Sequence, residues 1–469
     1  MCAQPSGIGR AQGYDIGCAQ RADTLQTGFQ LMTPKEIHLN LFAFGAGHHA
    51  AAWRAVEGSV EKLGLISWWE ELARTAERGK LDAVFLADGQ AINPVGLENG
   101  PGWFLEPVTA LTAMARATNN IGLISTISST FWQPFHAARM IASLDHISGG
   151  RAGINVVTSM TDAEARNHGM DALPGHDVRY ARAAEFIETI TALWDSWPAE
   201  SLVMDRAGKF ADSSLIKSID HDGEFFQVAG PLNIPSPPQG RPVLFQAGSS
   251  PQGREIAAKY AEAIYSVAWD LEQAQDYRSD IHARATAQGR EPMPVLPGLV
   301  TFVGTTVEEA RAKQQALNAL LPVKDSLNQL SFFVGQDCST WDLDAPPPPL
   351  PPLEEFSGPK GRYETVLRII ESKSPTVREL LGYLAAGGGH ATFIGTPESI
   401  ADEIERWIDE GGADGFNLMP PMLPHSLDDF VDLVVPELQR RGRFRTEYSH
   451  TTLRGHLFNQ VAYSARSLV

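Results

Sequence analysis

Short apolar or β-branched runs alternate with amphipathic stretches along most of the chain. In one amphipathic stretch, Ala183, Ile187, Ile190 and Trp194 follow steps of four, three and four residues, which places them on one face of a helix. A second stretch begins after the cap residue Thr396 and stops at a Gly-Gly pair. The strand-like runs are 37–44, 83–87, 121–127, 152–158, 242–246, 262–267, 295–303 and 415–419.

Strand-like runs separated by helices are typical of parallel βαβ units. A count near eight favours a closed (β/α)8 barrel over an open, doubly wound sheet, which usually has fewer strands. The α/β barrel is therefore the predicted fold.

Two segments break this alternation. Residues from about 198 to 240 are rich in aspartate and proline, and residues from about 322 to 392 contain a polyproline run and Gly387-Gly388-Gly389. Loops of such length are usually functional. We expect a flexible tail over residues 1–33, a barrel over 34–440 with these two insertions, and a tail over 441–469. The second insertion is interpreted as a lid or substrate region, the alternative being a structural or oligomer-forming segment.

The composition narrows the function classes. The 38 Lys and Arg against 56 Asp and Glu give a net charge of −18, which argues against nucleic acid as a partner. The three cysteines, Cys2, Cys18 and Cys338, have no metal-ligand spacing and form no disulfide framework. The apolar runs are too short for a membrane span, and the first residues lack the apolar centre of a signal peptide. We expect a cytoplasmic protein without a membrane partner.

Small polar residues occupy the ends of the predicted strands. His48 follows the first strand, Asp88 the second, Thr126 ends the third, and Asn155 lies in the fourth. In a barrel, active sites form at the carboxyl ends of the strands. These groups suit a flavin held by hydrogen bonds, with the hard chemistry left to the cofactor. The plainer alternatives are a turn or cap role for Asp88 and a structural hydrogen bond for Asn155.

A phosphate site is indicated after the fifth strand, at Gly248-Ser249-Ser250-Pro251. Pro251 suits the first turn of a helix, so hydroxyls and free N–H groups would converge at a helix N-terminus. An ordinary serine cap is the alternative. His176 and Tyr180 lie four residues apart at the start of another helix and would reach the same phosphate. Otherwise they are a solvated histidine and a half-buried tyrosine.

Two other interpretations of the first strand's end are less favoured. His48 and His49 have neither an H-E-x-x-H motif nor paired cysteines beside them, so we expect no metal site. The same turn contains Gly45-x-Gly47-x-x-Ala50, which is similar to a dinucleotide fingerprint, with Glu70-Glu71 at about the expected distance. However, histidines fill the variable positions of this pattern, and Asp88 lies too far along the sequence to accept a hydrogen bond from the ribose. A dinucleotide site is therefore less favoured.

Taken together, the motifs resemble those of the nitrilotriacetate, EDTA and dibenzothiophene-sulfone monooxygenase family, within the bacterial-luciferase-like superfamily. The resemblance covers residues from about 35 to 440 and rests on several segments in the same order. They are Ile37–Phe42, Gly47-His48-His49 with Ala52-Trp53-Arg54, Phe85–Asp88, Thr126–Thr130, Leu144-Asp145-His146 with Ser148–Arg151, Asn155–Ser159 with Asp162–Asn167, His176–Tyr180, Arg182-Ala183 with Glu185-Phe186, and Gln246–Ser250.

This resemblance implies a luciferase-like TIM barrel and the oxygenase component of a two-component flavin monooxygenase. The enzyme would use reduced FMN from a separate NAD(P)H-dependent FMN reductase, together with O2, to oxidise a small organic substrate with a C–N or C–S bond. The FMN-binding residues by position would be Asp88, Thr126, His176, Tyr180 and Ser250, with Asn155 and Ser249 as additions. His48 matches a catalytic candidate, and we expect a homodimer or homotetramer.

Three rival functions remain open at this stage. A deazaflavin-dependent oxidoreductase on the same barrel would transfer hydride without oxygen. A barrel hydrolase would use His48 and Asp88 as acid and base. A non-catalytic protein would bind flavin without turnover.

Overall fold

The computed structural model describes residues 36–94, 96–102, 105–356 and 360–459. The expected tail over residues 1–33, Cys2 and Cys18 lie outside them. Eight parallel strands form a closed barrel, in which β11 pairs back with β1. This confirms the barrel and excludes an open sheet. In order around the barrel the strands are β1 (His38–Phe42), β2 (Ala83–Leu86), β3 (Gly122–Ser128), β4 (Ala152–Val157), β7 (Val243–Gln246), β8 (Ala263–Ser266), β9 (Val295–Val303) and β11 (Gly415–Leu418).

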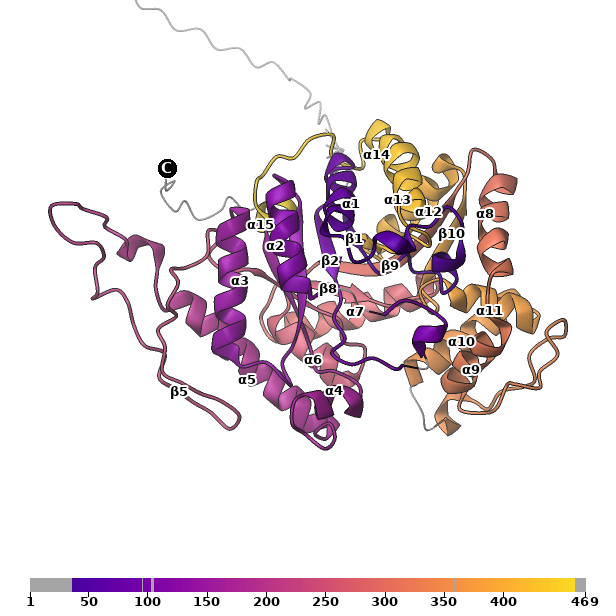
Figure 1. The fold of residues 1–469 in the computed structure, drawn as a ribbon, viewed down its shortest axis with the longest axis horizontal. Coiled ribbons are helices and arrows are strands. Elements are labelled where there is room, and N and C mark those ends of the chain that lie inside the picture. Colours follow the sequence, from indigo (N-terminus) through magenta and orange to yellow (C-terminus); the bar gives the residue numbers. More distant parts are fainter. Residues whose placement is uncertain (1–35, 95, 103–104, 357–359, 460–469) are drawn as a thin grey trace, which may run out of the picture. The chain divides into compact units, whose positions relative to one another are not determined.

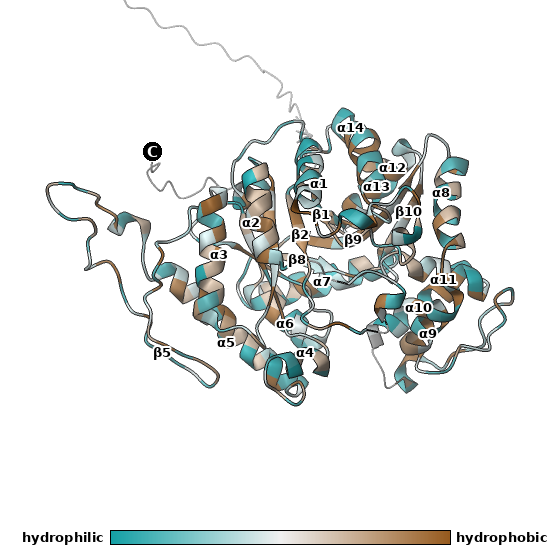
Figure 2. Ribbon diagram, viewed as in Figure 1, coloured by the Kyte–Doolittle hydropathy of each residue, from teal (hydrophilic) through white to brown (hydrophobic). Residues whose placement is uncertain are grey.

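Amphipathic helices cover the outside of the barrel and turn their apolar faces toward the strands (Figure 2). Thr396 accepts a hydrogen bond from Ser399 N at the start of α12, and Pro397 occupies the first turn, as the sequence predicts. The covering helices are α1 (Ile66–Arg78), α2 (Pro107–Ala117), α3 (Pro134–Ser148), α5 (His176–Asp195), α6 (Pro251–Tyr260), α7 (Leu271–Ala287), α8 (Val307–Ala319) and α12 (Pro397–Asp409). Among the described residues, no helix is long and apolar enough to cross a membrane.

The amino-terminal end of the barrel is closed by the last described part of the chain. Helix α15 (Leu453–Phe458) places Leu453 and Leu457 in an apolar cluster with the barrel residues Phe85 and Phe245. The sequence assigns this part to a tail, whereas residues 441–459 pack against the base of the barrel.

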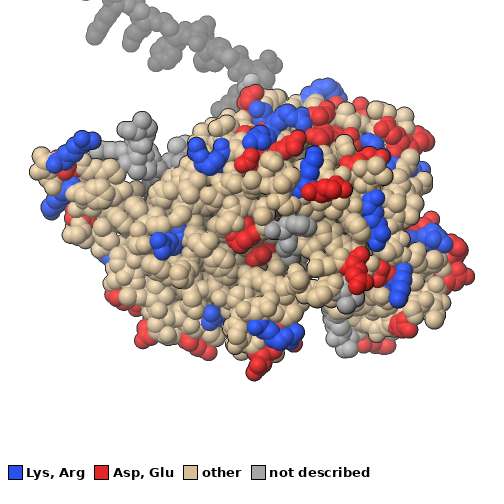
Figure 3. Space-filling model, in the orientation of Figure 1, with Lys and Arg blue, Asp and Glu red and all other residues tan. Residues whose placement is uncertain are grey.

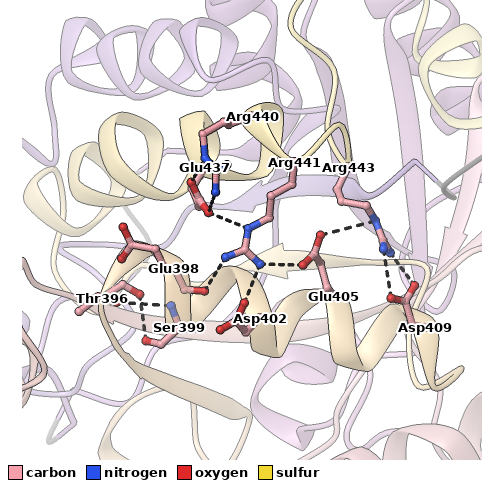
Figure 4. Close-up of polar contacts among 10 residues, drawn as sticks. All are labelled: Thr396, Glu398, Ser399, Asp402, Glu405, Asp409, Glu437, Arg440, Arg441 and Arg443. Carbon is pink, nitrogen blue, oxygen red and sulfur yellow. Dashed lines mark hydrogen bonds and ion pairs between the residues drawn. The ribbon is translucent and has the colours of Figure 1, made fainter.

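An ion-pair network fixes α14 (Val435–Arg440) and the residues after it to α12 (Figure 4). Arg441 binds Asp402 at 2.6 Å and Glu405 and Glu437 at 2.7 Å each. Figure 3 shows acidic and basic side chains interspersed on the face it draws, and many of them gather over this region. The charges there pair with one another instead of forming a patch of one sign.

The second insertion departs from the barrel after α8. It contains α9 (Val323–Val334), α10 (Lys360–Lys373) and α11 (Val377–Ala385), which pack around an apolar cluster of their own. The chain returns through β10 (Ala391–Gly395), a strand that the sequence analysis left unassigned. β10 pairs with β9 from Leu299 to Val303, which overlaps the pairing with β11 at Leu299 and extends past it.

The first insertion has little regular structure. Its short strands β5 (His221–Asp222) and β6 (Gln227–Val228) form an antiparallel pair, and Figure 1 shows the segment extending beside α3 and α5. Phe210 on this segment is 67% exposed, which is unusual for a phenylalanine.

Candidate active site

Asp88, Thr126 and Asn155 come from three adjacent strands, β2, β3 and β4, with Asp88 just after the end of β2. Thr126 and Asn155 are direct partners in the β3–β4 register, and Asn155 Nδ2 donates to Thr126 Oγ1 at 3.0 Å. The other amide atom, Asn155 Oδ1, is buried without a hydrogen-bond partner in the structure. A buried polar atom without a partner is costly, which makes Asn155 Oδ1 a candidate acceptor for a ligand.

Asp88 follows β2 on the neighbouring strand and is half-buried. Gln90 Nε2 donates to its carboxylate at 3.0 Å. Burial raises the pKa of Asp88, Gln90 opposes that shift, and the nearby carboxylates of Glu106 and Glu164 add to it. A carboxylate in such surroundings would gain from an N–H donor on a ligand.

The proposed phosphate residues converge where two helices begin. Helix α5 starts at His176, and Ser250 caps α6 by accepting from Gly253 N at 3.1 Å. Ser250 Oγ also donates to Tyr180 Oη at 3.3 Å, and the rings of His176 and Tyr180 lie 4.6 Å apart. Ser250 is thus both the ordinary cap and part of a cluster of three polar side chains. Ser249 is exposed, and its carbonyl accepts from an arginine on α6 at 3.1 Å.

The loop after β4 is held in a strained form beside these groups. Ser159 has a φ of +60°, which a residue with a side chain rarely adopts. Its hydroxyl lies 2.8 Å from Ser128 Oγ, and Arg179 of α5 donates to its carbonyl at 2.5 Å. Strain of this kind is concentrated at functional sites.

The two adjacent histidines after β1 take different roles. His48 Nε2 lies 2.9 Å from the carbonyl of Phe42, so Nε2–H donates to it and Nδ1 is left as an acceptor. Burial lowers the pKa of His48 to about 4 against the effect of the Phe42 carbonyl, so the ring is neutral at pH 7. His49 points elsewhere, with Nε2 3.0 Å from Asn318 Oδ1 and Nδ1 accepting from Ala51 N at 3.1 Å. His49 is structural.

A second set of polar residues at the mouth was not predicted from the sequence. Tyr265 at the end of β8 donates to His390 Nε2 at 2.6 Å, while His390 Nδ1 binds the carbonyl of Gly387. Burial, followed by the charge of Arg362, lowers the pKa of His390 to about 3, and burial raises the pKa of Tyr265. Both side chains are therefore neutral at pH 7. In the sequence, the position of Tyr265 at the end of a predicted strand could have indicated a site residue. No sequence pattern indicates His390.

Arg362 reaches this set from α10, in the second insertion. Its Nη1 donates to the carbonyl of Gly388, and its guanidinium lies 5.7 Å from the ring of Phe333 on α9. Burial lowers the pKa of Arg362, and Tyr265 opposes the shift. The insertion therefore contributes a cation to the mouth of the barrel.

A cavity of about 630 Å³ leads from His48 toward the second insertion. Its wall combines the loop after β1 with the start of α9, and includes His48, Trp53, Asn99, Pro322, Asp325 and Gln329. The insertion thus borders an entry to the site. Among the described residues, no cluster of His, Cys, Asp and Glu could hold a metal ion.

The glycines of the two turns at the mouth are explained by close packing. A Cβ on Gly47, whose φ is +133°, would lie 2.3 Å from the carbonyl oxygen of Pro421, so this pattern reflects a crowded turn and not a dinucleotide loop. Gly387, Gly388 and Gly389 all have positive φ. Gly387 N donates to the carbonyl of His48 at 3.0 Å, so this turn is anchored to the barrel.

Comparison with known proteins matches residues 54–415 to the family described as luciferase-like monooxygenase. The chain belongs to this family. It is 43% identical over 426 residues to N-acetyl-S-(2-succino)cysteine monooxygenase of Bacillus subtilis, covering 90% of this chain and 96% of the relative. It is 42% identical over 438 residues to nitrilotriacetate monooxygenase component A of Aminobacter aminovorans, with the same coverage. The crystal structure of riboflavin lyase with modified FMN and riboflavin has a TM-score of 0.79 at 30% identity, covering 91% and 96% of the two chains.

Membership defines the chemistry of this luciferase-like protein in general terms. It is a flavin-dependent monooxygenase of the two-component type, which uses reduced FMN and O2 to oxidise a small organic substrate and depends on a flavin reductase. The resemblance found in the sequence is confirmed. The hydrolase and deazaflavin alternatives are not retained.

Proposed function

We propose that His176, Tyr180 and Ser250 hold the phosphate of reduced FMN. The observation that carries this assignment is their convergence at the first turns of α5 and α6, with the Ser250 and Tyr180 hydroxyls 3.3 Å apart. Helix N-termini favour anions through their free N–H groups and dipoles. Ser249, one residue before the cap, would add its backbone N–H or hydroxyl.

The ring of FMN would lie over the ends of β2, β3 and β4. Asn155 has a buried oxygen without a partner, and the Thr126 hydroxyl, which accepts from Asn155, has its own proton free to donate. Asp88 on the next strand would accept from a ring N–H. When bound, reduced FMN supplies the electrons with which O2 is activated. The fit rests on this set of donors and acceptors along one edge of the barrel.

His48 would act at the substrate side of the site. Because its pKa is about 4, it is a neutral ring whose Nδ1 accepts a hydrogen bond, and it is too weak a base to carry a proton through much of the cycle. We assign it the orientation of an O–H or N–H group of the substrate beside the cavity. The residues from about 322 to 392 would cover the mouth and exclude water while the reaction proceeds.

Binding of reduced FMN under anaerobic conditions tests the phosphate assignment. Tyr180→Phe and Ser250→Ala should each weaken binding about tenfold or more, since a hydrogen bond to a charged group contributes roughly 1.5–3 kcal/mol. Ser250→Ala should also cost about 1 kcal/mol of stability through the lost cap. Tyr260→Phe on α6 removes a hydroxyl outside the cluster and serves as the control. Unchanged affinity in both site variants would remove the assignment.

Turnover separates a working oxygenase from the non-catalytic alternative. The purified chain with NADH alone should form no product, and addition of an FMN reductase should start O2-dependent oxidation. A panel of small compounds with C–N or C–S bonds, followed by mass spectrometry with labelled O2, identifies the substrate. A chain that binds reduced FMN but transfers no labelled oxygen across the panel would support the non-catalytic alternative.

We also propose that the chain assembles as a homodimer or homotetramer. The exposed Phe210, Val203 and Met204 of the first insertion support a subunit contact there. Light scattering of the native chain and of Phe210→Ser tests this assembly. A monomer in both would refute it.

A further inference from the structure

The turn at Gly387-Gly388-Gly389 links the backbone of His48 to the side chain of Arg362, two residues from distant parts of the chain. On one side, Gly387 N donates to the carbonyl of His48 at 3.0 Å. On the other, the carbonyl of Gly388 accepts from Arg362 of α10. A Cβ on Gly388 would lie 3.0 Å from Arg362 Nη1, so the absence of a side chain there makes room for the guanidinium.

Arg362 is the charged member of this cluster. His48 and His390 are neutral because burial keeps their pKa values near 4 and 3, and Tyr265 is protonated. No ion pair of the described residues includes Arg362, and its hydrogen bond to Gly388 uses one of five N–H donors. Among the described residues, Arg362 is therefore a cation without a paired anion.

A cation that is largely removed from water without an anion is unfavourable, and buried charges in proteins are normally paired. The lowered pKa of Arg362 agrees with that cost. The free donors of a guanidinium form a planar fork that matches the two oxygens of a carboxylate. A ligand with such a group would supply the missing charge.

We propose that Arg362 anchors a carboxylate group of the molecule that is oxidised at the barrel mouth. The inference rests on the proposed function, because it assumes that the substrate lies beside His48 at this mouth. Arg362 comes from the insertion, so the cover of the site also selects the substrate. Neutral molecules of the same shape leave the charge uncompensated and bind more weakly.

Matched acids and amides test the anchor. The probes are N-acetyl-S-methylcysteine, benzylthioacetic acid and iminodiacetic acid, each paired with its primary amide. Binding of each probe to the flavin-free chain is measured by ligand-observed NMR. The kcat/KM of each probe is measured in a coupled assay with reductase, FMN and NADH. At least one acid should bind about tenfold to a hundredfold more tightly than its amide, as a charge-assisted hydrogen bond predicts. No preference for any acid would overturn the proposal.

Arg362→Gln separates the anchor from a structural role, because glutamine keeps an N–H donor for the Gly388 carbonyl and loses the charge. It should remove the acid preference and leave amide binding unchanged. Arg311→Met, on α8 outside the cluster, is the matched control and should keep the preference. Retained preference in Arg362→Gln means that the guanidinium only supports the turn. The affinity for reduced FMN should stay unchanged in Arg362→Gln. If the native chain does not bind FMN, the proposed phosphate site is refuted, but the comparison of acids and amides on the flavin-free chain still tests the anchor.

Discussion

Two arginines at opposite ends of the barrel show how the ends differ. Arg151, just before β4 at the base, is 2% exposed and uses all its donors, whereas Arg362 at the mouth makes one hydrogen bond. The acceptors of Arg151 are the carbonyls of Ser148, Ile121, Ala115 and Thr118 and the hydroxyl of Thr118, at 2.7 to 3.1 Å.

The number of donors in use thus distinguishes Arg151, which supports the fold, from Arg362, for which we propose a ligand. The same contrast holds for carboxamides. Gln239 near the base donates at 2.6 Å to Asp145 and to the carbonyl of Ala152, while Asn155 at the mouth keeps a buried oxygen without a partner. In these two pairs, the side chain at the base has its partners within the protein, and the one at the mouth keeps a donor or an acceptor unused.

The largest effect should come from Arg151→Met. Removal of the guanidinium leaves several buried carbonyls without donors, which should cost about 3–5 kcal/mol of unfolding free energy. Arg362→Gln should cost less than about 1 kcal/mol, because its single hydrogen bond can be kept. Urea unfolding of both variants measures the difference. Equal losses would show that the two ends do not differ in this way.

Acid should destabilise the protein through buried histidines. The pKa of His390 is lowered by burial to about 3, so its contribution to stability is full above the unfolded value near 6.5 and is lost as pH falls toward 3. Between pH 7 and pH 4.5 this amounts to about 3 kcal/mol, since one pKa unit is about 1.4 kcal/mol. His390→Gln should flatten the pH dependence. His456 at the base, with a pKa near 4, provides the counterpart variant for the other end.

Gly388→Ala tests whether the mouth is a hinge or a fixed support for Arg362. The φ of +66° makes alanine strained by roughly 1–2 kcal/mol, and its methyl group would displace the guanidinium. We expect more hydrogen peroxide per NADH consumed and a weaker preference for acids. The measurement compares the yield of hydrogen peroxide with the yield of oxidised product, each per NADH consumed. If only the subunit number changes, the insertion is an interface and not a lid.

The smallest effect on stability should come from Asn155→Leu. The leucine removes a buried amide whose oxygen has no partner, so the unfolding free energy should change by less than about 1 kcal/mol. Affinity for reduced FMN should nevertheless fall. Thermal unfolding and anaerobic titration are the two measurements, and a large loss of stability with unchanged affinity would assign Asn155 to the fold.

The barrel was predictable because its signals are local. Strand-like runs and the Thr396 cap are set by neighbouring residues, and all eight strands lie where the sequence places them. β10 was missed because it follows a long insertion and pairs only with the far half of β9. The role of residues 441–459 was also missed, since the contact of Leu453 with the barrel joins parts of the chain that no local pattern relates.

The site was predictable in part for the same reason. Strand ends point to Asp88, Thr126 and Asn155, and a helix start points to Ser250. Their roles stay predictions. Arg362 and His390 come together through the fold of an irregular insertion. The role of Arg362 is inferred from how many of its N–H donors have partners, and a sequence does not show this.

The separate apolar core of α9, α10 and α11 has an evolutionary consequence. Apart from Trp269, which follows β8, its buried members come from residues 327–384 of the insertion. Figure 1 shows α9, α10 and α11 side by side. Because this segment packs mainly on itself, its sequence can change, or the whole segment can be replaced by that of a relative, without changing the packing of the barrel. A change of substrate would then need changes in one segment only, while the proposed FMN-binding residues at β2, β3 and β4 stay the same. For protein engineering, residues 322–390 form a natural unit for grafting.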